Sequence, residues 1–348
     1  MPPSPISALQ TKTWESTLPL EIRLSPSECR TFDRSDPYLI QFPRLSYLPF
    51  LLPRLHAFFS SALINPDVAA HEGWLSFEDV PLKWHYPLDL LYDLFSGAKP
   101  ADLARHHSAI HGKNKVYGEE RDSNVESVRD NSGVLPWRLV VHFTTWPEEQ
   151  LIKLDANGKV LHDAFINSVK EVLEAYSSPS SIGTELTAAV SSQADYTRNG
   201  TAKVVMSLSK DDSTALWRAV QQHDLSLFNT INNKLLNPPG SKLRHIPVKI
   251  YLPTTASPSG TTATEGSAAS IRVVQSLVAP FLPSRQPQTL GTALNDILPT
   301  VFPSRRNPLL AHAVLHGAVV PLGAVLQDLG KALAYADGFL HVVVVMMA

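Results

Sequence analysis

The sequence contains one cysteine, Cys29, among 348 residues. A single thiol can form neither an intramolecular disulfide nor a multi-cysteine zinc site, so both kinds of stabilisation are excluded. Cys29 lies in the polar segment SPSECRTF with no histidine nearby in the sequence, and we therefore do not expect a catalytic thiolate there.

An excess of charge of either sign is also absent. Thirty basic and 32 acidic residues leave a formal net charge of −2, which argues against a dedicated nucleic-acid binder and against a polybasic membrane anchor. The N-terminal stretch MPPSPISALQTKTWEST has no basic segment followed by an apolar run, and no stretch is long enough to span a bilayer. We therefore expect a cytoplasmic protein whose partners are proteins.

Catalytic signatures are missing as well. The sequence contains no G-x-S-x-G, G-x-x-x-x-G-K-[ST], G-x-G-x-x-G or H-E-x-x-H motif, which weakens an enzymatic interpretation. His106, His107 and His111 form a loose cluster, but a solvated polar loop explains them better than a metal site. We expect no catalytic residue, no cofactor and no metal.

What the sequence does contain is a repeated order of elements. Hydrophobic patterning predicts two strands, a helix, a strand or hairpin, a short helix and a strongly apolar strand in the N-terminal part. These elements are PLEIRLS (19–25), YLIQFPRLS (38–46), FLLPRLHAFFSSAL (50–63), WLSFEDVPLKW (74–84), PLDLLYDLF (87–95) and WRLVVHF (137–143).

The same order returns near the C-terminus. It consists of HIPVKIYL (245–252), SIRVVQSLV (270–278), the helix TLGTALNDIL (289–298) with Thr289 as N-cap, AVLHGAVV (313–320), GAVLQDLGKAL (323–333) and FLHVVVVMM (339–347). The β-β-α-β-α-β order is that of a β-grasp domain, in which the long apolar last strand lies at the centre of the sheet. The sequence therefore predicts an α+β fold with two ubiquitin-like β-grasp domains, although other α+β folds share this order.

A helical region separates the two copies. It contains the amphipathic segment AFINSVKEVLEAY (164–176) and LWRAVQQHDLSLFNTINNKLL (216–236), which keeps helical spacing. Three polar or low-complexity stretches, 96–134, 177–201 and 254–270, are predicted to be loops or insertions.

Two features of these segments are ambiguous from the residues alone. Lys170 lies at the edge of the apolar stripe of its helix, where a solvated flanking lysine is the simplest interpretation. In LKWHYPLDLLYDL (82–94), Trp84 and Tyr86 fit an interaction surface and a cap on the core equally well.

Seven ordered segments together resemble the autophagy protein 5 family. They are PRLSYLPFLLPRLHAFF, VPLKWHYPLDLLYDL, LPWRLVVHFTTWPEEQLI, NSVKEVLEAY, LWRAVQQHDLSLFNTINNKL, RHIPVKIYL and LHGAVVPLGAVLQDLGKALAYADGFLHV. The resemblance covers most of the chain outside the three insertions, and it implies two ubiquitin-like domains that flank a helix-rich domain. We accordingly expect an N-terminal helix in 1–16, a first ubiquitin-like domain in 17–145, a helix-rich domain in 146–240 and a second ubiquitin-like domain in 241–348.

The resemblance also implies a function. In this family the lysine that matches Lys170 accepts the C-terminal glycine of the ubiquitin-like autophagy protein 12 in an isopeptide bond. The nearest upstream lysines, Lys153 and Lys159, are expected to lie outside the helix that contains Lys170 and not to replace it as acceptors. The conjugate binds the coiled-coil autophagy protein 16 and acts like a ligase, helping a conjugating enzyme to transfer the ubiquitin-like autophagy protein 8 to phosphatidylethanolamine at the preautophagosomal membrane. Arg44, Trp84 and Tyr86 are the candidates for the groove that binds protein 16.

Two alternatives remain open at this point. The chain could be a non-conjugated β-grasp adaptor, in which Lys170 is an ordinary surface lysine, or an enzyme with an unrecognised site. An upward shift of the chain on an immunoblot of native extract would indicate conjugation, whereas turnover by the purified chain alone would indicate an enzyme.

Overall fold

The structure, a computed structural model, describes residues 5–30, 35–95, 135–174, 209–235, 245–254 and 270–347. Within these ranges the side chains of 170–174, 234–235, 253–254 and 270 are outside the description. The predicted insertions 96–134 and 177–201, and all of 254–270 except its two end residues, lie outside the described residues. The histidine cluster at His106, His107 and His111 therefore lies outside them too.

The first sheet has the strand order β2-β1-β5-β3-β4. Its strands are β1 (Thr17–Leu24), β2 (Tyr38–Pro43), β3 (Trp74–Phe77), β4 (Val80–Pro81) and β5 (Trp137–His142). β5 lies between β1, with which it is parallel, and β3, with which it is antiparallel. Alternate residues of β1 and β5 point to a core that is closed by α2 (Leu52–Phe59) and α3 (Leu88–Phe95).

The second sheet repeats this topology as β7-β6-β10-β8-β9. Its strands are β6 (Ile246–Thr254), β7 (Ser270–Val278), β8 (Ala311–Leu315), β9 (Ala318–Val319) and β10 (Leu340–Met346). The predicted central positions of WRLVVHF and FLHVVVVMM are confirmed, as are the two ubiquitin-like folds. α10 (Leu290–Ile297) begins after Thr289, whose hydroxyl accepts the Thr292 N–H as predicted for an N-cap, and α11 (Leu326–Ala332) precedes β10.

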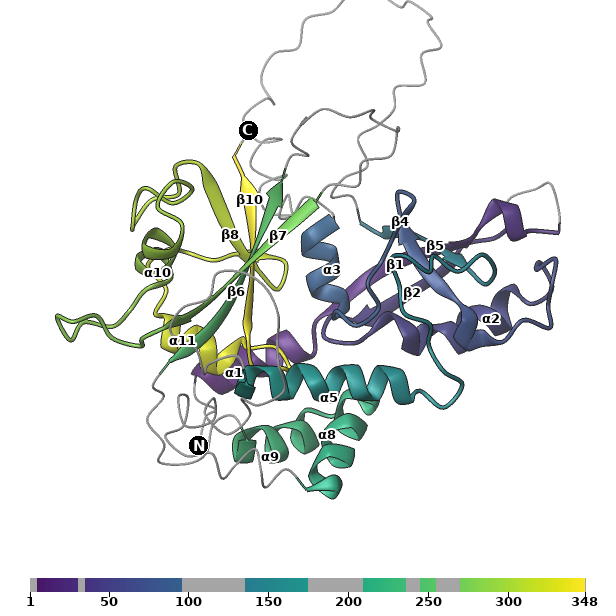
Figure 1. Cartoon of the computed structure of the whole chain (residues 1–348), viewed down its shortest axis with the longest axis horizontal. Helices are drawn as coiled ribbons and strands as arrows, with labels where there is room; N and C mark the ends of the chain where they lie inside the picture. The colour runs from purple at the N-terminus through teal and green to yellow at the C-terminus, as the bar shows by residue number, and fades with distance from the viewer. Residues whose placement is uncertain are drawn as a thin grey trace, which may run out of the picture.

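The continuous burial of β10, whose residues are apolar except for His341, has a cause outside its own domain. Leu340 to Val344 are all buried, whereas a strand with one solvated face alternates. α10 and α11 cover one face of the sheet, and α3 of the first domain packs on β10, with Leu90 in the same core cluster. α3 is visible between the two sheets in Figure 1.

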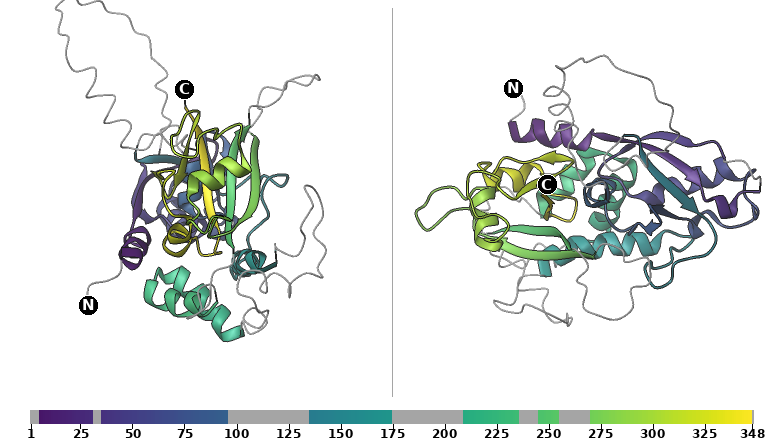
Figure 2. Two further views of the ribbon diagram at one scale, coloured as in Figure 1. Left: turned by 90° about the vertical axis from the view of Figure 1, so that its left-hand side faces the viewer. Right: turned by 90° about the horizontal axis from the view of Figure 1, so that it is seen from above.

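The remaining helices form a bundle below the two sheets. α5 (Lys159–Glu174) runs beneath both sheet domains, and α8 (Lys210–Gln222) and α9 (Leu225–Leu235) lie below it (Figure 1). α1 (Pro5–Trp14) contacts α11, and the two views of Figure 2 place it beside the second sheet domain. The family prediction of helices between two ubiquitin-like domains is thus confirmed.

Two predicted elements are wrong in detail. The segment 313–320 is a hairpin and not one strand, because His316 and Gly317 both have positive φ angles, of 52° and 73°, and form a tight turn between β8 and β9. The helical pattern across 216–236 is broken at His223, which has φ 57° and ends α8. Asp224 then caps α9, since its Oδ1 accepts the N–H groups of Ser226 and Leu227.

Candidate functional site

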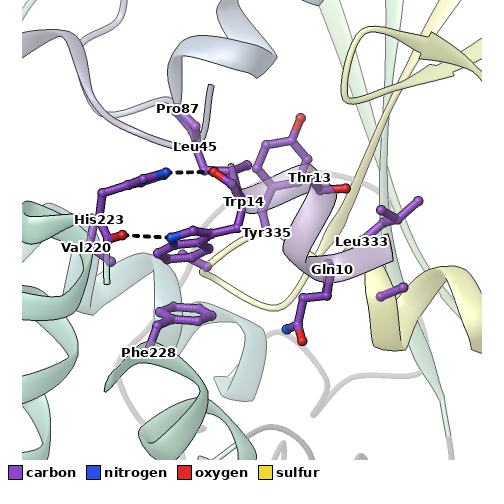
Figure 3. Close-up of a pocket in the computed structure, with 13 residues that line it drawn as sticks. Gln10, Thr13, Trp14, Leu45, Pro87, Val220, His223, Phe228, Leu333 and Tyr335 are labelled. Atoms are coloured by element: carbon purple, nitrogen blue, oxygen red, sulfur yellow. Dashed lines mark hydrogen bonds between the residues drawn. The ribbon is translucent and has the colours of Figure 1, made fainter. Parts of the chain in front are cut away.

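The break between α8 and α9 forms a joint with the N-terminal helix. Trp14 Nε1 donates to the carbonyl of His223 at 2.9 Å, and His223 Nε2 donates to the carbonyl of Trp14 at 2.7 Å (Figure 3). The two rings stack with centroids 4.9 Å apart. Burial lowers the pKa of His223 although the Trp14 carbonyl opposes this shift, so the ring is neutral with its proton on Nε2.

A small hollow beside this joint is lined by all three domains. Leu45 and Pro87 come from the first sheet domain, Val220 and Phe228 from the bundle, and the segment 332–336 from the second sheet domain (Figure 3). Its volume of ≈ 20 Å³ is room for about one water molecule. The hollow is therefore a packed joint that fixes the domains, and it is too small for a ligand.

A second hollow, which we call the three-domain groove, has a volume of ≈ 460 Å³. It shares Pro87, Tyr335 and Ala336 with the small hollow. Its remaining lining residues are Tyr47, His85 and Tyr86 of the first sheet domain, Ala164, Asn167 and Ser168 of α5, and Lys249, Asp337 and His341 of the second sheet domain. Aromatic walls and a polar rim of this size suit a protein segment.

A short chain of hydrogen bonds connects Asp337, His341 and Tyr251 beside the groove. Asp337 Oδ2 lies 2.8 Å from His341 Nε2, and His341 Nδ1 lies 2.8 Å from the hydroxyl of Tyr251. Burial alone would raise the pKa of Asp337, but His341 and Lys249 outweigh it and hold this pKa below its usual range. The groove thus presents an ionised carboxylate next to Lys249 at neutral pH.

Two other ionisable groups of the groove remain neutral. Burial, helped by Lys83 and Lys249, lowers the pKa of His85 to about 4. Burial, together with the charge of Asp337, raises the pKa of Tyr47. The groove therefore combines the Asp337 carboxylate and Lys249 with the neutral side chains of His85 and Tyr47 and with aromatic faces.

The structure separates the three residues predicted to line a partner groove. Tyr86 lines the three-domain groove. Trp84 is 7% exposed and donates Nε1–H to the carbonyl of Ile152 at 2.8 Å, so it packs in the core between the first sheet and the bundle. Arg44 binds Asp89 at the contact between the two sheet domains. A role of these three residues in partner binding stays a prediction.

Lys170 lies in α5, and its side chain is outside the described part of the chain. The same helix buries Leu161, Phe165 and Val169 against the bundle core. One correction concerns Lys159, which was expected outside this helix: Asp155 caps α5 by accepting the backbone N–H of Lys159, and the helix begins at that residue. Lys159 still lies eleven positions before Lys170, about 16 Å away along the helix axis.

Several groove residues were not predicted from the sequence, among them Tyr47, Lys249, Asp337 and His341. The string YADGFLH stood out as part of the family resemblance, but no pattern indicated that its Asp337 and His341 would pair across a turn. Tyr47 and Lys249 are ordinary members of a loop and a strand, and they give no signal until the domains are assembled.

Neither a metal site nor a membrane span is found in the part of the chain that the structure describes. Among the described residues no group of three or more His, Cys, Asp or Glu side chains is placed to hold a metal ion. Cys29 is a half-buried thiol. The described helices also include none with the length and apolar character needed to cross a bilayer.

Comparison with known proteins gives consistent matches along the chain. The family models for the UblA domain, the alpha-helical bundle region and the UblB domain of autophagy protein ATG5 match residues 13–143, 193–238 and 245–344. Autophagy protein 5 of Phaeosphaeria nodorum is 51% identical over 341 residues, with 98% of this chain and 97% of the relative covered. Autophagy protein 5 of Aspergillus oryzae is 46% identical, with 98% of both chains covered. The crystal structure of Kluyveromyces marxianus Atg5 has the same fold, with a TM-score of 0.63 at 17% identity over 97% of this chain and 98% of that chain.

Proposed function

The chain belongs to the autophagy protein 5 family, and from this membership we propose that it is a conjugation acceptor and scaffold in autophagosome formation. In this proposal the ε-amine of Lys170 forms an isopeptide bond with the C-terminal glycine of the ubiquitin-like autophagy protein 12. Activating and conjugating enzymes supply the catalysis, so the chain is a substrate and not an enzyme. The lysine amine attacks the thioester that joins protein 12 to the conjugating enzyme, so the C–S bond breaks, the enzyme's thiol is released and the amine loses a proton.

The observation that carries this proposal is that two faces of α5 are already occupied by other contacts. One face of the helix is buried through Leu161, Phe165 and Val169, and a second face lines the three-domain groove through Ala164, Asn167 and Ser168. At about 100° per residue, position 170 lies roughly 140° from the middle of the buried face and roughly 115° from the middle of the groove face. A modifier attached at this position leaves both the core and the groove undisturbed.

The groove is the proposed site of the coiled-coil autophagy protein 16. Its walls come from three domains, and its volume and aromatic lining suit the apolar face of an amphipathic helix, the helix-in-groove mode of recognition. Tyr86 is the predicted groove residue that lines it. The polar rim, with Lys249 and Asp337, supplies charged partners for the flanks of such a helix.

The assembled conjugate would act like a ligase. It would bring the conjugating enzyme of the pathway to the preautophagosomal membrane, where the ubiquitin-like autophagy protein 8 is joined to phosphatidylethanolamine. We therefore propose a cytoplasmic protein that associates peripherally with that membrane.

The acceptor role is tested by reconstitution of the chain with the activating enzyme, the conjugating enzyme, protein 12 and ATP. Lys170→Arg keeps the charge and the helix propensity, but guanidinium is a poor nucleophile, so the covalent adduct should disappear. Lys159→Arg is the matched control in the same helix and should be conjugated like the wild type. Adduct formation by Lys170→Arg at the wild-type rate would show that another amine is the acceptor, whereas failure of the wild type to form an adduct would favour the alternative of a non-conjugated adaptor.

The groove assignment is tested separately by titration of a protein 16 helix against the unconjugated chain. Asn167 is exposed and lines the groove, so Asn167→Trp should obstruct it and weaken binding at least tenfold. Lys159→Trp adds the same ring to an exposed position of α5 outside the groove and should bind like the wild type. Equal affinities for the two variants would show that protein 16 binds to a surface other than the three-domain groove.

A further inference from the structure

The contact between the two sheet domains contains a buried group of charged residues that the proposed function does not use. We call it the interdomain clasp, and it consists of Arg44, which follows β2, Asp89 and Asp93 of α3, and His316 and Gly317 of the β8–β9 turn. Asp89 and Asp93 are 0% and 1% exposed. Carboxylates are seldom buried this completely without full pairing.

Asp89 is fully paired. It accepts hydrogen bonds from Arg44 through Oδ1 and from His316 Nδ1 through Oδ2, the latter at 2.8 Å. His316 Nε2 lies 2.8 Å from the carbonyl of Leu333, which can only accept. Both ring nitrogens therefore act as donors, and His316 is an imidazolium. Burial would raise the pKa of Asp89, but His316 and Arg44 outweigh it and keep this pKa low.

Asp93, one helical turn after Asp89, is only partly paired. Its Oδ2 accepts the N–H of Gly317 at 3.0 Å, whereas its Oδ1 has no hydrogen-bond partner among the described residues. Its neighbours include the ionised Asp89 and the guanidinium of Arg44, which already serves Asp89. A second negative charge here would be buried beside the first with no cation of its own.

We propose that the interdomain clasp holds one proton on Asp93 while the two sheet domains are docked, and that loss of this proton as pH rises loosens their contact. The geometry is the basis: two buried carboxylates one turn apart face one guanidinium and one imidazolium, and an oxygen of the second carboxylate is unsatisfied. Burial, reinforced by the charge of Asp89, holds the pKa of Asp93 well above its usual range, in agreement with this assignment.

The direction of the pH dependence follows from linkage. When the domains separate, Asp93 meets water and its pKa returns towards about 3.9. Between that value and the raised value, the docked form holds one proton more than the undocked form, so docking weakens by up to about tenfold per pH unit as pH rises. Two other groups that face the clasp keep their charge states: burial would lower the pKa of Arg44 but Asp89 outweighs it and raises this pKa, and burial raises the pKa of Tyr335, whose ring stacks on His316 at 4.3 Å. Tyr92, which lies beneath Arg44, is a further phenol at this site.

The interdomain clasp is connected to the groove wall. His316 donates to the carbonyl of Leu333, and Tyr335, which stacks on His316, lines the three-domain groove. Loosening of the clasp would therefore shift the segment that carries Tyr335 and Ala336. The groove would be best formed on the acidic side of the transition, whatever partner it binds.

The test uses the full chain and three proteins: wild type, Asp93→Asn and the control Asp296→Asn. Asparagine keeps an acceptor for Gly317 N–H and cannot ionise, whereas Asp296 has a side chain that is 53% exposed. Hydrogen–deuterium exchange of the β8–β9 turn is measured between pH 6 and 9 and divided by the intrinsic exchange rate at each pH. Opening in the wild type and in Asp296→Asn should increase with pH, by up to about tenfold per unit, and Asp93→Asn should abolish this increase.

Infrared spectroscopy of the folded wild type provides a measurement that does not depend on how the variant folds. A protonated carboxyl band should be present over the pH range in which exchange rises, and exchange should level off at the pH where this band disappears. Absence of that band in the folded wild type, or an unchanged pH dependence of exchange in Asp93→Asn, would overturn the proposal.

Discussion

Replacement of Asp89 by asparagine tests whether the interdomain clasp stabilises the fold. The substitution removes one negative charge and keeps the shape and one acceptor oxygen of the side chain. It leaves Arg44 and the imidazolium of His316, whose side chains are 17% and 7% exposed, without their shared counter-ion. His316 can release its proton, whereas the guanidinium of Arg44 cannot.

The expected cost follows from this geometry. Removal of one partner from a buried ion pair destabilises a protein by about 3–5 kcal/mol. Two features place Asp89→Asn at the lower end of this range: Arg44 retains partial contact with water, and Asp93 can ionise and act as a new counter-ion once the neighbouring charge is gone. We expect a loss of about 3 kcal/mol, roughly a hundredfold change in the unfolding equilibrium.

Urea unfolding of the full chain at pH 7, followed by tryptophan fluorescence and by circular dichroism, measures this loss. Asp296→Asn serves as the exposed control and should unfold like the wild type, because exposed ion pairs contribute little. If Asp89→Asn stays within about 0.5 kcal/mol of this control, the clasp contributes no stability and the argument from burial is refuted.

Three further substitutions have defined outcomes. Leu139→Asp puts a charge at a position in the central strand β5 that is 1% exposed, and it should abolish cooperative thermal unfolding of the first sheet domain; a sharp, unshifted transition would contradict the strand order. Gly317→Ala adds a methyl group that would collide with Arg44, at a residue whose φ of 73° is unfavourable for alanine. We expect the free energy of unfolding, measured by urea titration, to fall by about 2–4 kcal/mol. A fall of less than about 1 kcal/mol would mean that the turn adapts to the methyl group. Trp14→Phe retains the stacking on His223 but leaves a carbonyl without its donor, and it should lower stability by about 1–2 kcal/mol in a thermal scan, whereas an unchanged midpoint would show that the joint is not stabilising.

The sheet topology could be predicted from the sequence because each central strand has a clear local signature. Leu18, Leu20, Ile22 and Leu24 alternate with less buried residues along β1, as expected for a sheet with one buried face. FLHVVVVMM is apolar on both faces and was therefore expected at the centre of its sheet. The pattern did not reveal that α3 of the other domain covers the second face, since nothing in either segment identifies its partner.

Local backbone features were harder to predict from the sequence. The helical spacing of apolar residues continues through His223, so periodicity indicates one helix, and only the paired hydrogen bonds with Trp14 explain why the chain turns there. The sequence His316-Gly317 is compatible with a turn, but its function in the clasp depends on Asp89 and Asp93, more than 200 residues away in the chain. Such contacts join segments whose pairing is fixed by the assembled domains.

The candidate site was predictable to the extent that it rests on family resemblance. Lys170 has no distinguishing feature in the pattern of its helix, and its assignment came from the resemblance alone. Tyr86 lines the groove, whereas Trp84 and Arg44 have buried contacts that composition and spacing did not indicate. An amphipathic ring or a basic group beside a helix start fits a core position and a binding surface equally well.

The most direct test of the acceptor assignment is to locate the isopeptide bond itself. Wild-type chain is conjugated to protein 12 in the reconstituted system, digested, and analysed by tandem mass spectrometry for branched peptides. The account predicts one branched peptide, with the C-terminal glycine of protein 12 attached to Lys170. A branch on Lys153, Lys159 or another lysine, with Lys170 unmodified, would contradict it.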